Sequence, residues 1–248
     1  MKKAIFILAL AAAWNCAAFA LAPADSVRLH RAIFKLGGDS VVVEYARPNR
    51  PGRFNSVLVL PDRFGVNLGS RQLIQSLAGK GVNAYVMHIR SVAVDTSQAY
   101  PEVHFDSSDI RLANALALEI VTDSATGDRI AVIGMDVGAD IALKMVTAIP
   151  MFSACIVFYP TLKSTIERDA SNLTCPIYIH VAELDGEFNM ARANNLKEIL
   201  WDNGKKGYVN MYKQAKRFFF NPLHRNYHPV NSVQAWASIL QFLRSRLR

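Results

Sequence analysis

The chain has 248 residues, 51% of them hydrophobic, which is enough for one large domain and a little short for two. Its formal net charge is +8, but the basic residues are scattered and cluster locally only at Lys205–Lys206 and at Arg244, Arg246 and Arg248. We therefore expect no nucleic-acid partner, and at most a mild attraction to anionic ligands or lipid surfaces.

The N-terminus has the layout of a secretory signal peptide spanning residues 1–20. Lys2 and Lys3 precede an apolar stretch over 4–13, and the triplet Ala18-Phe19-Ala20 offers a cleavage site after Ala20. A membrane anchor is the alternative, but the apolar stretch is short and is interrupted at residues 14–15. We expect an exported, soluble protein, periplasmic or secreted, whose single domain covers 21–248.

Two cysteines, Cys155 and Cys175, remain after this cleavage, and the net charge falls to +6 because two lysines leave with the signal peptide. Each cysteine lies near the start of a strand-like segment. If these two strands are parallel neighbours, the thiols lie near bonding distance, and an oxidising compartment favours a disulfide. Two buried free thiols are the equal alternative.

Apolar β-rich runs alternate with helical patterns along the rest of the chain. In order, the strand-like runs are 41–48, 55–62, 82–89, 128–136, 153–160, 175–185 and 207–213, and the helix-like runs are 68–80, 107–121, 139–148, 189–202 and 232–244. This alternation predicts one doubly wound, mostly parallel α/β sheet with helices on both faces. Function in such sheets gathers at the carboxyl ends of the strands, so the residues just after each run are the candidates.

Three residues at these strand ends stand in a suggestive order. The segment "IAVIGMDVGADIAL" places Asp136 in the pattern Gly-x-Asp-x-Gly, which is typical of the sharp strand-to-helix turn called a nucleophile elbow. Asp185 follows the run 175–185, and Arg217 follows the run that ends at 213. The order nucleophile, acid, base along the chain is that of an α/β-hydrolase.

Several segments in this order resemble the dienelactone hydrolase family over nearly all of the mature chain. They are "SVLVLPDRFGVN", "SLAGKGVNAYVMHI", "VAELDGEF" and "MYKQAKRFFFNP". The resemblance implies an α/β-hydrolase fold and a hydrolase acting on a small ester, lactone or related electrophile, without a cofactor or a metal. It puts Asp62 at the acidic position of the oxyanion loop, backbone oxyanion donors at Arg63 and Val137, and the acid of the triad at Asp185. Only 46 residues separate Gly138 from Asp185, which leaves no room for a large cap domain.

Three substitutions depart from the family pattern: Arg63 replaces an apolar residue of the oxyanion loop, Asp136 replaces the nucleophilic cysteine (serine in some relatives), and Arg217 replaces the histidine. A carboxylate nucleophile suits attack on an alkyl carbon better than ester hydrolysis. Arginine does not lose its proton in a protein and cannot be the base. His224 and His228 are candidate substitutes for the base. His88 and His104 are weaker candidates, and His180, inside an apolar strand, reads as a core residue.

Two hypotheses follow. In the first, the protein is an exported hydrolase in which Asp136 acts as nucleophile or polariser and a histidine reaches both Asp136 and Asp185. In the second, it is an inactive relative with a binding or scaffold role, in which Arg217 bridges the two carboxylates. A variant of the second lets Arg217 and Arg63 bind an anionic small molecule. The sequence leaves the substrate and the oligomeric state open.

Overall fold

The computed structural model describes residues 27–90, 105–161 and 169–248. The expected signal peptide, its cleavage site and His104 lie outside these residues. In the described part of the chain, no helix has both the length and the apolar character needed to cross a bilayer.

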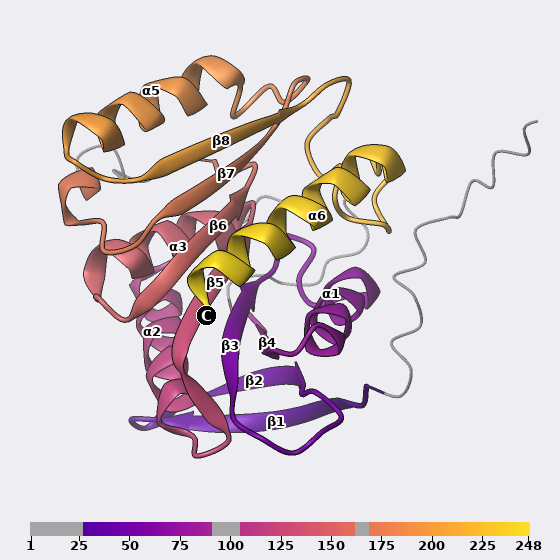
Figure 1. The fold of residues 1–248 in the computed structure, drawn as a ribbon, viewed down its shortest axis with the longest axis vertical. Coiled ribbons are helices and arrows are strands. Elements are labelled where there is room, and N and C mark those ends of the chain that lie inside the picture. The colour runs from indigo at the N-terminus through magenta and orange to yellow at the C-terminus, as the bar shows by residue number, and fades with distance from the viewer. Residues whose placement is uncertain (1–26, 91–104, 162–168) are drawn as a thin grey trace, which may run out of the picture.

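The centre of the molecule is an eight-stranded sheet with the strand order β1-β2-β4-β3-β5-β6-β7-β8 (Figure 1). All pairs from β4 to β8 are parallel, whereas β2 pairs antiparallel with both β1 and β4. The predicted mostly parallel sheet is therefore confirmed. The strands are β1 (Leu29–Leu36), β2 (Asp39–Ala46), β3 (Phe54–Leu60), β4 (Asn83–Met87), β5 (Thr126–Met135), β6 (Phe152–Phe158), β7 (Ile177–Ala182) and β8 (Gly207–Tyr212).

Strand β1 was not among the predicted elements. Its sequence, LHRAIFKL, alternates along the strand, so that Phe34 and Leu36 face the protein while Ile33 and Lys35 face solvent. Such alternation is expected of an edge strand with one solvent-exposed face. The strand lacks the continuous apolar run by which the buried parallel strands are recognised.

Helices cover both faces of the sheet, as Figure 1 shows. One core lies between the sheet and α2, α3 and α5, and a second lies between the sheet and α1 and α6. The helices are α1 (Leu68–Gly79), α2 (Ser107–Thr122), α3 (Val137–Ala148), α5 (Met190–Asp202) and α6 (Pro229–Arg246), with a short 3-10 helix η1 (Ala170–Asn172). The described residues between Gly138 and Asp185 form only α3, β6, η1 and β7, and hold no cap domain.

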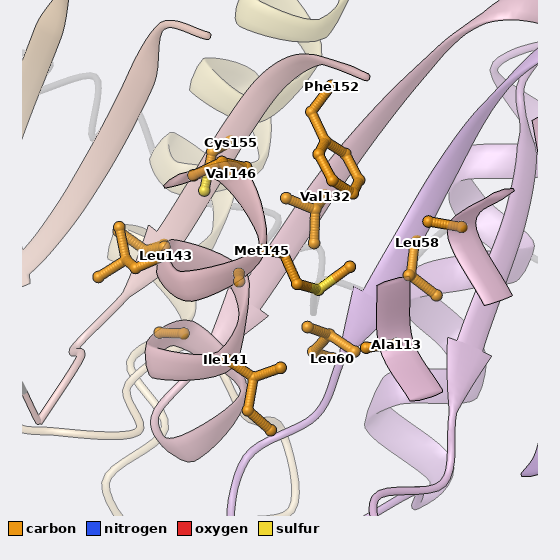
Figure 2. Close-up of a cluster of buried hydrophobic side chains, with 14 of the residues drawn as sticks. Leu58, Leu60, Ala113, Val132, Ile141, Leu143, Met145, Val146, Phe152 and Cys155 are labelled. Atoms are coloured by element: carbon orange, nitrogen blue, oxygen red, sulfur yellow. The ribbon is translucent and has the colours of Figure 1, made fainter. Parts of the chain in front are cut away.

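Helix α3, which begins at the elbow, is apolar over most of its surface because it is buried beneath neighbouring elements. Figure 2 shows Ile141 and Met145 of α3 directed towards Leu60 of β3 and Val132 of β5. All four side chains are inaccessible to solvent. This close packing fixes the start of α3 against the carboxyl ends of the central strands.

Cys155 and Cys175 are both free thiols buried in the core beneath α3. Of the two alternatives for these cysteines, the structure has the free pair rather than the disulfide. Burial raises the pKa of Cys155 well above its usual range and that of Cys175 to about 12, so both thiols stay protonated and unreactive in the folded protein.

Candidate functional site

The turn between β5 and α3 has the geometry of a nucleophile elbow. Asp136 has φ 55° and ψ −118°, a strained conformation for a residue with a side chain. A Cβ atom on Gly138 would lie 2.3 Å from the carbonyl oxygen of Leu60, and one on Gly134 would lie 2.3 Å from that of Gly138. Both glycines are therefore required for the close approach of α3 to β3 and β5.

The Asp136 side chain is completely buried and is held by Arg63, from the loop after β3. Arg63 Nε lies 2.6 Å from Oδ2 and Nη2 lies 2.7 Å from Oδ1, and the Arg63 backbone N–H donates to Oδ2 at 3.2 Å. The paired side-chain bonds form the bidentate fork that arginine and carboxylate adopt in strong ion pairs. The oxyanion-loop N–H expected to bind substrate thus binds Asp136.

Arg217, from the loop after β8, bridges the two carboxylates. Its Nη2 donates to Asp136 Oδ1 at 2.5 Å, and its Nη1 donates to Asp185 Oδ2 at 3.1 Å. Asp185 also accepts hydrogen bonds from the backbone N–H groups of Glu187 and Phe188. We call Arg63, Asp136, Asp185 and Arg217 the ion network. Each of its side chains is less than one-tenth exposed.

The charges of the ion network set its protonation states. Burial opposes ionisation of Asp136, but the hydrogen bonds from Arg63 and the charge of Arg217 outweigh it and hold the pKa below its usual value. Burial raises the pKa of Asp185 above its usual value despite Arg217. Burial also opposes the charge on Arg217, but Asp136 and Asp185 raise its pKa above the ordinary range. Asp136 is therefore an ion and Arg217 a fixed cation.

Aromatic rings enclose the network. The Arg217 guanidinium lies 5.7 Å from the ring centre of Tyr159 and 5.5 Å from that of Phe218. Both aromatic residues have positive φ values, 37° and 68°. Among the described groups, the Tyr159 hydroxyl and the Arg217 Nε are buried with no hydrogen-bond partner. Strained backbone is concentrated here, as it is at functional sites, since Asp136, Tyr159 and Phe218 all have positive φ.

Asp62 lies between the ion network and a cavity. Its carboxylate accepts hydrogen bonds from the Phe64 backbone N–H at 3.0 Å and from Asn221 Nδ2 at 2.9 Å. Burial, together with the nearby Asp136 charge, raises the pKa of Asp62 to about 7. The cavity is narrow, about 20 Å³, and is lined by Pro61, Asp62, Gly65, Asn67, Gly69, Ser70, Leu73, Met135, Phe220, Asn221 and Pro222.

The candidate histidines do not join the ion network. His224 packs its ring against Phe64 and Phe218, and its Nδ1 accepts from the Asn226 backbone N–H. His228 caps α6, where its Nδ1 accepts from the Asn231 backbone N–H. Neither ring, both being described, has a hydrogen bond to Asp136 or Asp185. Among the histidines that the structure describes, none substitutes for Arg217 in contact with the carboxylates.

His88 and His180 also lie in structural surroundings. His88 Nε2 lies 3.1 Å from Glu44, beside Arg71, and away from the elbow. His180 is wholly buried, with Nδ1 2.7 Å from the Tyr212 hydroxyl, while its Nε2 has no partner among the described residues. Burial lowers the pKa of His180 to about 3, so it is a neutral core residue.

The resemblance-based positions fall together in space. Val137, the other expected oxyanion donor, is the first residue of α3, where backbone N–H groups lack helical acceptors. Asp62, Arg63, Asp136, Asp185 and Arg217 meet at the carboxyl ends of their strands. The sequence reading missed Tyr159 and Asn221. Tyr159 directly follows β6, so its position at a strand end was the available signal; Asn221 lies in a loop with no such signal.

A mostly parallel sheet with an elbow after its central strand defines the α/β-hydrolase class. Within this class, the model of the dienelactone hydrolase family matches residues 42–247, and the chain belongs to this family.

Relatives agree with this assignment. A Bradyrhizobium protein described as a probable 2-oxo-3-(5-oxofuran-2-ylidene)propanoate lactonase is 23% identical over 227 residues, covering 85% of this chain and 91% of the relative. A Klebsiella pneumoniae protein assigned as a dienelactone hydrolase has the same fold, with a TM-score of 0.77 and 18% identity, over 87% of this chain and 98% of its own. A dienelactone hydrolase-like promiscuous phosphotriesterase from metagenomic libraries superposes with a TM-score of 0.75 and 14% identity, over 90% and 99% of the two chains.

Proposed function

We propose that this member of a hydrolase family binds a small molecule and does not hydrolyse esters through its elbow residue. The observation that carries the proposal is the occupation of the Asp136 carboxylate. Four N–H groups from Arg63 and Arg217 donate to its two oxygens. A carboxylate has about four lone-pair sites, so little electron density remains to attack a substrate.

The other two parts of a hydrolytic mechanism are also altered. Arg217 stands where a base is needed and stays protonated at any working pH. The backbone N–H of Arg63, a donor that should stabilise an oxyanion, is already bonded to Asp136. Arg63 and Arg217 are already matched by Asp136, Asp185 and, 3.7 Å from Arg217, Glu187, so an anionic ligand gains little from these two cations.

Two narrow clefts open beside Asp62, with volumes of about 20 and 40 Å³, and they share Gly69, Leu73, Phe220 and Pro222. They admit only the polar end of a small ligand, and the rest of the ligand would lie over their mouths. Tyr227 and Trp236 extend the apolar wall. We propose that the ligand is small, uncharged and largely apolar, with one polar end that hydrogen-bonds to Asp62 or Asn221.

Hydrolysis assisted by Asp62 is the second candidate. A carboxyl group with a pKa of about 7 can act as a general base near neutral pH. Asp62 has such a pKa and lines the cavity. In this version, Asp62 activates a water molecule that attacks a small lactone or ester. The lactonase-like relative supports the substrate class.

Steady-state hydrolysis of p-nitrophenyl acetate and dihydrocoumarin, measured across pH for the wild type and Asp62→Asn, separates the candidates. The binding proposal expects no saturable rate in either protein. A saturable wild-type rate that rises through pH ~7 and disappears in Asp62→Asn would replace it with the second candidate. A saturable rate retained in Asp62→Asn would contradict both.

We also propose that the protein is exported and processed after Ala20. The layout of residues 1–20 supports this proposal. N-terminal sequencing of the protein recovered from the cell envelope should begin at Leu21. A full-length N-terminus recovered from the cytoplasm would refute export.

A further inference from the structure

A second concave surface lies at the amino ends of the central strands, opposite the elbow. It is formed where α1 ends and where the last turns of α6 pass over the sheet (Figure 1). The cleft measures about 190 Å³, and its apolar lining consists of Leu77, Val82, Leu240, Leu243 and Leu247. A shallower cleft along α6 adjoins it and shares Leu240, Arg244 and Arg248. We call the two together the amino-edge groove.

The groove is rimmed by positive charge. Lys80, Arg244 and Arg248 line it and are exposed, and none of them forms an ion pair with a described residue. The Arg50 guanidinium also lies beside the groove, because it comes within 3.2 Å of the position a Cβ would take on Gly81. No acidic side chain lines either cleft. The rim of the apolar floor is therefore net positive, although the carbonyl end of α6 offsets part of the charge of Arg244.

The C-terminal end of α6 is hydrogen-bonded to residues of the sheet. Asn55 Nδ2 donates to the Leu247 carbonyl at 2.5 Å, and Arg129 Nη1 donates to the Arg246 carbonyl at 3.0 Å. The Arg246 guanidinium bonds to the Tyr208 hydroxyl and lies over the Phe242 ring. These contacts fix the backbone that carries Arg244 and Arg248, so the rim is part of the fold.

We propose that the amino-edge groove binds one anionic amphiphile, a carboxylate with an alkyl chain. The chain lies along the leucines and Val82, and the carboxylate pairs with Lys80, Arg244 and Arg248. The floor is aliphatic and offers no aromatic side chains on which nucleic-acid bases could stack. The groove is concave, which suits a single alkyl chain better than a flat bilayer surface. This site is independent of Asp62 and of the ion network, which lie at the opposite ends of the strands.

Displacement of dansylaminoundecanoate fluorescence tests the proposal with full-length mature protein. We expect decanoate to displace the probe and acetate to be ineffective, with affinity rising up to about fourfold for each added methylene. Decanol, which lacks the charge, should compete at least about tenfold more weakly than decanoate, and added salt should weaken the binding of decanoate. Equal competition by decanol and decanoate would overturn the proposal.

A matched pair of variants locates the site. Lys80→Ala with Arg244→Ala should weaken probe binding about tenfold or more, since two rim charges are lost. Lys197→Ala with Lys206→Ala removes the same charge from exposed positions on α5 and before β8, and should leave binding unchanged. All four residues are exposed, so thermal melting should confirm that both variants fold. Equal affinity in the two double variants would refute the groove as the binding site.

Discussion

The Arg63 guanidinium and the Asp136 carboxylate form a two-bond fork in a nearly dry environment, with N–O distances of 2.6 and 2.7 Å. The Asp136 side chain is fully buried and that of Arg63 is 9% exposed. Buried charges are tolerated only when they are closely paired, because each ion loses its hydration on folding. The pair therefore stabilises the fold chiefly through the penalty that removing one member would cause.

Asp136→Ala should lower the free energy of unfolding by about 3–5 kcal/mol, because Arg63 would lose its buried carboxylate partner and Arg217 would keep only Asp185 and the more distant Glu187. Urea denaturation gives the value directly. Asp128→Ala is the matched control, since its ion pair with Arg53 is exposed; it should cost about 1 kcal/mol or less. Similar losses in the two variants would show that the buried network is unimportant for stability.

Restoring the family residues should restore hydrolysis, provided that the elbow retains its catalytic geometry. The triple variant Arg63→Ile, Asp136→Cys, Arg217→His removes the ion pairs around residue 136. It places a cysteine thiol and a histidine base beside the existing acid, Asp185. We expect hydrolysis of p-nitrophenyl acetate to be at least about 10²-fold faster than for the wild type. The variant without Arg217→His lacks the base and should stay slow. A folded but inert triple variant would mean that these side chains do not share a productive cleft.

Stability should depend on the ionisation of Asp62. Its pKa in the folded protein is about 7 and its unfolded value is about 3.9, so between these pH values the folded state binds the extra proton. The Asp62 contribution is therefore present at low pH and is lost as pH rises towards 7, by at most about 1.4 kcal/mol per pH unit.

His180 acts in the opposite direction, because its pKa is lowered to about 3 and the unfolded state gains a proton below about 6.5. The difference between wild type and Asp62→Asn isolates the carboxyl group. Guanidinium denaturation at several pH values should show the wild type losing stability relative to the variant as pH rises from about 4 to about 7. A constant difference would mean that Asp62 titrates normally.

Gly138→Ala should destabilise the protein by about 1–3 kcal/mol, since the new Cβ would lie 2.3 Å from the Leu60 carbonyl and 2.4 Å from that of Pro61. Relief requires α3 to move away from β3. Gly186→Ala serves as the control, because no atom lies within 4 Å of its added Cβ. Thermal melting of the two variants compares them, and an equal change would argue against the close approach.

The sequence sufficed for the parallel sheet because buried strands such as β5 are continuous apolar runs between helices. It did not reveal β1, whose alternating edge pattern is weak. The positions of Asp136, Asp185 and Arg217 at strand ends were predictable from spacing. The two-bond pair between Arg63 and Asp136 was not predictable, because a sequence pattern gives the position of Arg63 in the loop but not the direction in which its guanidinium points. The surroundings of His224 and His228 likewise depend on how one loop folds.

The internal balance of the ion network has a consequence for how the molecule meets charged solutes. The two cations of the network are paired with Asp136 and Asp185 and, more distantly, with Glu187, so they project little positive field into solvent. The unpaired rim of Lys80, Arg244 and Arg248 has no such cancellation. We expect the rim, as proposed above, to attract a diffusing anion to the amino ends of the strands, opposite the elbow.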